Sequence, residues 1–130
     1  NEARSMVAGL EAGLAAGEVR DDTLVLKLTG RYLLDGPRLV ALAEANAHAD
    51  ALLSMLPAEK QVFTGALAAR AGLLLRLLRA MDWEFLESRW INLERAVWDA
   101  LVRACGGWPE EAGSHWPGLP RCHVVRLADL

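Results

Sequence analysis

Hydrophobic residues near the start of the chain recur at the spacing of a helix. Met6, Leu10 and Leu14 are four residues apart, and Gly17 follows at a position where a helix would end. This pattern predicts a first helix over residues 3–16.

Alternation replaces the helical period after this segment. Between residues 23 and 29, leucine occupies every second position and Val25 and Lys27 lie between the leucines, as in a strand with two different faces. Residues 32–34 are expected to form a second strand after a turn at Gly30. The pattern therefore predicts a small hairpin between two helices.

Three longer helices are predicted in the middle of the chain. The first covers residues 37–56 and has proline in its first turn, where no amide hydrogen is needed. The second covers residues 58–81, and Asp82 is a suitable N-cap for the third, over residues 83–105. Because almost no loop separates the last two helices, we expect them to form an antiparallel hairpin.

The end of the chain combines proline-rich and alternating sequence. Residues 108–120 contain three of the five prolines, so we expect them to cross the surface without long regular structure. Residues 121–127 alternate again and predict a strand that pairs with residues 23–29. The expected fold class is mainly α (α+β): a helical hairpin or bundle of about four helices with a small β-hairpin and a C-terminal strand.

Composition fits a folded domain. Hydrophobic residues make up 53% of the chain and charged residues 24%, which is too apolar for a disordered segment. Residues 1–130 are expected to be a single domain excised from a larger bacterial protein, because the sequence lacks an initiator methionine and its basic residues are mostly arginine. We expect it to be cytoplasmic, with Cys105 and Cys122 as free thiols or, alternatively, as a pair.

Two charged residues break the apolar faces of the last two predicted helices. Arg70 projects into one apolar stripe, and Glu94 projects into the other. Antiparallel packing of the two helices would bring these positions opposite each other. We therefore expect Arg70 and Glu94 to form a structural ion pair across the hairpin, because either charge alone would be costly to bury.

The sequence contains no recognisable catalytic, cofactor or metal motif. Glycine-rich phosphate loops and nucleophile elbows are absent, and the cysteines and histidines lack the close spacing of zinc ligands. We expect no catalytic residue, no cofactor and no metal. The apolar segment over residues 62–78 is interrupted by Arg70 and Arg76, so a membrane span is not expected either.

Tryptophan provides the main positive signal for function. Trp83 and Trp90 lie on the predicted core stripe of their helix, whereas Trp98, Trp108 and Trp116 are better explained as an exposed interface. These residues favour a non-enzymatic helical protein-interaction or assembly domain, with a protein partner or a second copy of itself as the binding partner.

The alternative prediction is a nucleic-acid-binding accessory domain. Residues 60–79 contain four basic residues and no acid, and the predicted order of helix, hairpin and helix at the start is typical of a winged-helix-like unit. With Arg70 assigned to the ion pair, the predicted contacts are Lys60, Arg76 and Arg79. A net charge of −3 permits such a patch but excludes a surface that is basic throughout.

Overall fold

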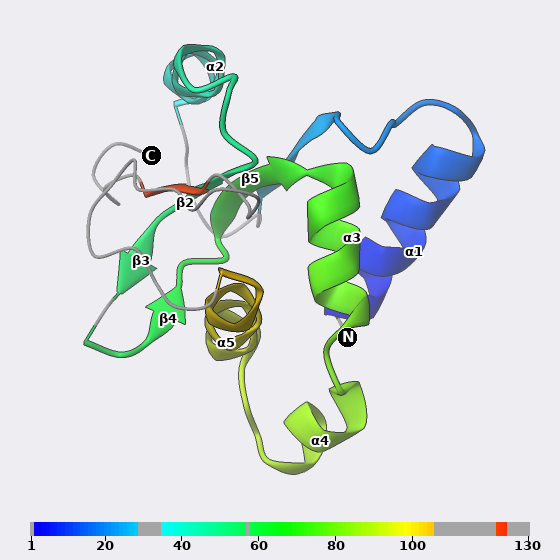
Figure 1. Ribbon diagram of the computed structural model, residues 1–130, viewed down its shortest axis with the longest axis vertical. Coiled ribbons are helices and arrows are strands. Elements are labelled where there is room, and N and C mark those ends of the chain that lie inside the picture. Colours follow the sequence, from blue (N-terminus) through cyan, green and yellow to red (C-terminus); the bar gives the residue numbers. More distant parts are fainter. Residues whose placement is uncertain (1, 29–34, 57, 106–121, 125–130) are drawn as a thin grey trace.

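A computed structural model gives the fold and describes residues 2–28, 35–56, 58–105 and 122–124, with the backbone alone for residues 104–105 and 122–124. These residues form an α+β structure of helices and short strands (Figure 1). The helices are α1 (Glu2–Ala15), α2 (Gly36–Ala45), α3 (Ala71–Arg79), α4 (Trp83–Ser88) and α5 (Leu93–Cys105). The strands are β1 (Leu24–Leu28), β2 (Ala51–Leu53), β3 (Met55–Leu56), β4 (Gln61–Val62), β5 (Ala66–Arg70) and β6 (Cys122–Val124).

The main sheet has the strand order β1-β5-β2-β6. Strand β5 is antiparallel to both of its neighbours, β1 and β2, whereas β6 pairs with β2 in parallel. The predicted C-terminal strand is therefore present in part, but its predicted pairing with residues 23–29 is wrong, because β6 lies beyond β2 and β5 from β1. Strands β3 and β4 form a separate two-stranded ribbon.

The helical bundle predicted from the sequence is wrong, chiefly because β5 replaces the first half of the helix expected over residues 58–81. Residues 66–69 are buried and pair with β1, and Ala68 and Ala69 also pair with β2 on the other side. A strand buried on both faces has a continuous apolar sequence without alternation, so periodicity alone does not separate it from a buried helix. Helix α3 begins directly after this strand, at Ala71.

The other two predicted helices are also shorter than expected. Helix α2 ends at Ala45, where Asn46 donates a side-chain hydrogen bond to the Leu42 carbonyl at 2.9 Å. The segment expected over residues 83–105 is divided into α4 and α5. Asp82 caps α4 as predicted, but Asn92 starts a new helix by accepting a hydrogen bond from the Arg95 amide at 3.0 Å. The predictions for α1 and β1 are confirmed, whereas residues 32–34 lie outside the described part.

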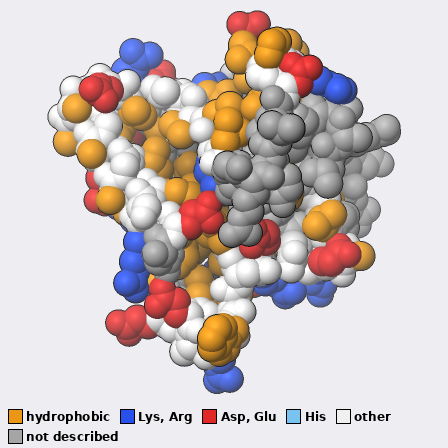
Figure 2. Space-filling model, turned by 180° about the vertical axis from the view of Figure 1, so that it is seen from behind, with side chains coloured by type: hydrophobic (Ala, Val, Ile, Leu, Met, Phe, Trp, Pro, Cys, Tyr) orange, Lys and Arg blue, Asp and Glu red, His pale blue; other side chains and the backbone are white. Residues whose placement is uncertain are grey.

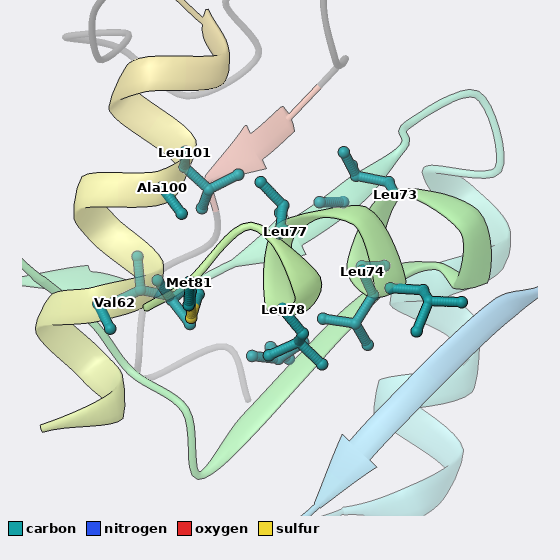
Figure 3. Close-up of a cluster of buried hydrophobic side chains, with 14 of the residues drawn as sticks. Val62, Leu73, Leu74, Leu77, Leu78, Met81, Ala100 and Leu101 are labelled. Carbon is teal, nitrogen blue, oxygen red and sulfur yellow. The ribbon is translucent and has the colours of Figure 1, made fainter. Parts of the chain in front are cut away.

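Helices cover both faces of the sheet. The main core lies between one face and helices α1, α3 and α5, and Leu78 and Leu101 are among its most buried side chains (Figure 3). Helix α2 covers the other face over a smaller cluster of Ala49, Leu52 and Ala68. The alternation of β1 places Val25 against the main core and Leu24 against the smaller one, so Lys27 shares the face of Val25.

Candidate interaction site

Helix α4 and the turn after it project from the lower end of the molecule, below α3 and α5 (Figure 1). No residue of α4 is fully buried. Phe85 is 51% exposed, and Trp90, in the turn, is 95% exposed. Seen from behind, the lowest part of the surface carries hydrophobic side chains beside basic ones (Figure 2). The projection therefore presents aromatic residues to solvent.

The backbone holds Trp90 in an unusual conformation. Its φ angle is 54°, in the left-handed region that costs a non-glycine residue roughly 1–2 kcal/mol. Two hydrogen bonds fix the turn: the Trp90 amide donates to the Glu87 carbonyl at 3.2 Å, and the Ile91 amide donates to the Leu86 carbonyl at 2.9 Å. The prediction that Trp90 belongs to the core is wrong, because this turn ends the helical stripe on which it was based.

A cation accompanies the two aromatic side chains. The guanidinium carbon of Arg89 lies 5.8 Å from the centroid of the Phe85 ring, within the range of a cation–π interaction. Phe85, Arg89 and Trp90 together are called the aromatic arm below. Tryptophan and arginine are the residues that most often dominate binding energy at protein interfaces.

A cavity of about 90 Å³ lies beside the arm, among α1, α4 and α5. Most of its wall is apolar, and the carboxylates of Glu2 and Glu87 are the acidic part of its lining. The apolar residues are Ala3, Trp83, Leu86, Ile91, Leu93 and Ala96. Such a lining suits an apolar group that also carries a hydrogen-bond donor or a positive charge.

Basic residues hold both cavity carboxylates. The Lys27 Nζ lies 2.8 Å from the Glu2 Oε1, and Lys27 also donates to the Thr64 carbonyl. The Arg4 guanidinium lies 3.9 Å from the Glu87 carboxylate. Lys27 is only 8% exposed, so the Glu2 carboxylate is fixed from inside the protein, whereas the contact of Glu87 with Arg4 is longer and lies at the surface.

Arg70 and Glu94 do not form the predicted ion pair, because each side chain binds other partners. Arg70 ends a strand, and its guanidinium donates to the backbone carbonyls of Asp22, at 2.9 Å, and Ala47. Glu94 accepts a hydrogen bond from the Thr64 hydroxyl at 2.5 Å. The prediction fails because the antiparallel helical hairpin that would have brought the two charges together does not exist.

The structure also changes the predicted interface. Trp98 is only 9% exposed and belongs to the main core, so its assignment to an exposed interface is wrong. Trp108 and Trp116 lie outside the described residues, as do the side chains of Cys105 and Cys122. Of the five tryptophans, the exposed one that the structure identifies is Trp90.

The residues proposed for nucleic-acid binding do not form one basic surface along a helix. Lys60 lies in the turn between β3 and β4, whereas Arg76 and Arg79 lie on α3. The Arg79 guanidinium is held by the Glu11 carboxylate, with a shortest distance of 2.6 Å. Nucleic-acid binding therefore stays a prediction that no contact in the described structure favours.

Among the described helices, none has the length and apolar character needed to cross a bilayer. Within the described ranges, no three histidine, cysteine or acidic side chains gather as metal ligands would.

Comparisons with known proteins give no indication of function, so the proposal below is based on the geometry of the site. The chain matches no protein-family model. No curated protein and no solved structure is significantly similar to it.

Proposed function

We propose that this chain is a non-enzymatic protein-interaction or assembly domain that binds its partner through the aromatic arm. The observation that carries the proposal is Trp90, a tryptophan that is 95% exposed in a hydrogen-bonded turn with a φ angle of 54°. Scattered hydrophobic residues on a surface need no explanation. A large aromatic residue held in solvent by a strained backbone does, since such strain concentrates at functional positions.

The neighbours of Trp90 support binding. Phe85, 51% exposed, adds a second aromatic ring, and Arg89 adds a charge that stacks on that ring. The three residues form a small aromatic and cationic group on a projection that another molecule can approach. Binding there would remove apolar surface from water at a site that is already ordered, which keeps the entropic cost of association low.

A photo-crosslinking amino acid placed at position 85 tests the proposal in cells that produce the chain. We expect a covalent adduct with a protein, identified by mass spectrometry, and its loss when Trp90→Ala is added. The matched control places the same amino acid at the exposed position of Glu44 on α2, where no adduct should form. Equal yields of adduct at both positions, or none at position 85, would show that the arm is not a binding surface.

A further inference from the structure

We infer that the partner is a second copy of this chain, with Trp90 of each copy in the cavity of the other and Arg89 at the cavity carboxylates. This inference rests on the function proposed above. It connects the exposed indole of Trp90 with the cavity. The two are neighbours in the chain, since the next residue, Ile91, lines the cavity, yet the indole is almost fully exposed and does not fill the cavity of its own chain.

The chemistry of the cavity suits an indole. Its wall is largely apolar and includes the side chain of Trp83, while the carboxylates of Glu2 and Glu87 provide acceptors. A buried tryptophan normally finds an acceptor for its N–H group. The cavity volume of about 90 Å³ is several times the roughly 10–15 Å³ that one water molecule needs on the same measure, so part of an aromatic ring can enter.

Charge complementarity favours the same arrangement. Arg89 is exposed and adjoins Trp90, so an indole in the cavity brings its guanidinium to the Glu87 carboxylate of the other copy. A carboxylate accepts several hydrogen bonds at once. Glu87 can therefore accept from the partner's arginine while it stays near Arg4, which lies 3.9 Å away in its own chain.

The position of the arm beside the cavity determines the symmetry. The segment that joins α3 to α5 carries the arm and also forms part of the cavity wall, so a two-fold axis near this segment would let each copy give and receive the same contact. Such an interface closes after two copies and does not propagate. Aromatic side chains bury at most about 150–250 Å² each, and Phe85 is already half covered, so two arms account for less than about 1,000 Å², which is below the size of a stable permanent interface.

The dimer should therefore be weak, with a dissociation constant in the micromolar range. Sedimentation equilibrium and light scattering of the whole chain over a wide concentration range should show a monomer–dimer equilibrium. Trp90→Ala should raise the dissociation constant by more than about tenfold, as expected for a hot spot. Val40→Ala is the matched control, since Val40 is 54% exposed on α2, and it should leave the equilibrium unchanged.

Charge exchange tests the proposed contact itself. Glu87→Arg and Arg89→Glu alone should each weaken the dimer several-fold, because each places like charges opposite one another, and the double variant should recover most of the loss. Circular dichroism of each variant checks that the fold is kept. Additive losses in the double variant would refute the contact between these two residues.

Two outcomes separate this inference from the proposed function. A wild-type chain that stays monomeric at every concentration, or a dimer that Trp90→Ala does not weaken, overturns the inference. If position 85 then still crosslinks to a different protein in a manner that depends on Trp90, the arm is a binding surface for another partner. If it crosslinks to nothing, both the inference and the proposed function fail.

Discussion

Lys27 and Glu2 form an ion pair in which one partner is buried and the other is half exposed. The distance between the Lys27 Nζ and the Glu2 Oε1 is 2.8 Å, and the side chains are 8% and 52% exposed, respectively. The lysine lies on β1 beneath the helices, and the glutamate lies in the first turn of α1. The pair therefore joins the start of α1 to the sheet at the edge of the cavity.

Loss of this contact should cost more than loss of a surface ion pair on the same helix. We expect Glu2→Ala to lower the free energy of unfolding by about 1.5–3 kcal/mol, because it leaves a buried ammonium group with fewer acceptors. Glu11→Ala is the matched control: Glu11 pairs with Arg79, and both side chains are about half exposed, so its loss should cost at most about 1 kcal/mol. Urea denaturation measures both, and equal effects would contradict the special role of Lys27.

Thr64 should depend on its hydroxyl group more than on its methyl group. The side chain is 2% exposed, and its hydroxyl donates to the Glu94 carboxylate at 2.5 Å. Thr64→Val removes this donor and should cost about 1–3 kcal/mol, whereas Thr64→Ser keeps the donor and should cost about 1 kcal/mol for the lost methyl group.

A double variant checks the cause of the Thr64→Val effect. Adding Glu94→Leu should recover part of the loss, since the carboxylate that lacks its donor is then absent. Thermal unfolding of the three variants gives the comparison. A Thr64→Ser variant that is less stable than Thr64→Val would show that shape, and not the hydrogen bond, determines the effect.

Arg70 should hold together three segments that are distant in sequence. Its guanidinium binds the carbonyls of Asp22 and Ala47, and the following amide, that of Ala71, donates to the Thr23 carbonyl at 2.9 Å. Arg70→Lys keeps the charge but loses the planar group that binds two carbonyls. We expect faster hydrogen exchange at the amides of residues 71 and 72, measured by NMR, and no change in Arg76→Lys, which alters an exposed arginine on α3.

The main core should respond strongly to the loss of a single leucine. Leu78 is fully buried and lies among the side chains shown in Figure 3. Leu78→Ala should lower the free energy of unfolding by about 2–5 kcal/mol, because it removes apolar contacts and leaves a cavity. Val40→Ala, on the exposed face of α2, should change it by less than about 0.5 kcal/mol. Guanidinium denaturation measures the free energy of unfolding of both variants. Similar changes in the two variants would show that the core is wrongly assigned.

The parts of the fold that follow local rules could be predicted, and those set by tertiary packing could not. Helix α1 and strand β1 have clear periods, and Asp82 caps α4 as its residue type predicts. Strand β5 is rich in alanine, which favours a helix locally. Its pairing with strands on both sides overrides that preference, and no pattern within the segment records the pairing.

The candidate site was missed for a related reason. Trp90 fits the apolar stripe of a helix over residues 83–105, so its exposure depends on the break before α5. Asn92 was the available signal, because asparagine is a frequent N-cap and its side chain does cap α5. The burial of Lys27 was harder to predict, because a lysine in an alternating strand is normally expected to face water.

The register between β1 and β5 is a choice among alternatives that the sequence of β5 alone barely distinguishes. Lys27 lies opposite Leu67, and the neighbouring partners on β5 are mostly alanine, so a shift by one residue would lose little packing on that strand. In β1 the same shift would turn Lys27 away from Glu2 and toward α2, and would direct leucines to the opposite face. The buried lysine thus makes misaligned strand pairings unfavourable during folding, and Lys27→Leu would produce a chain whose sheet has lost its main means of selecting one alignment.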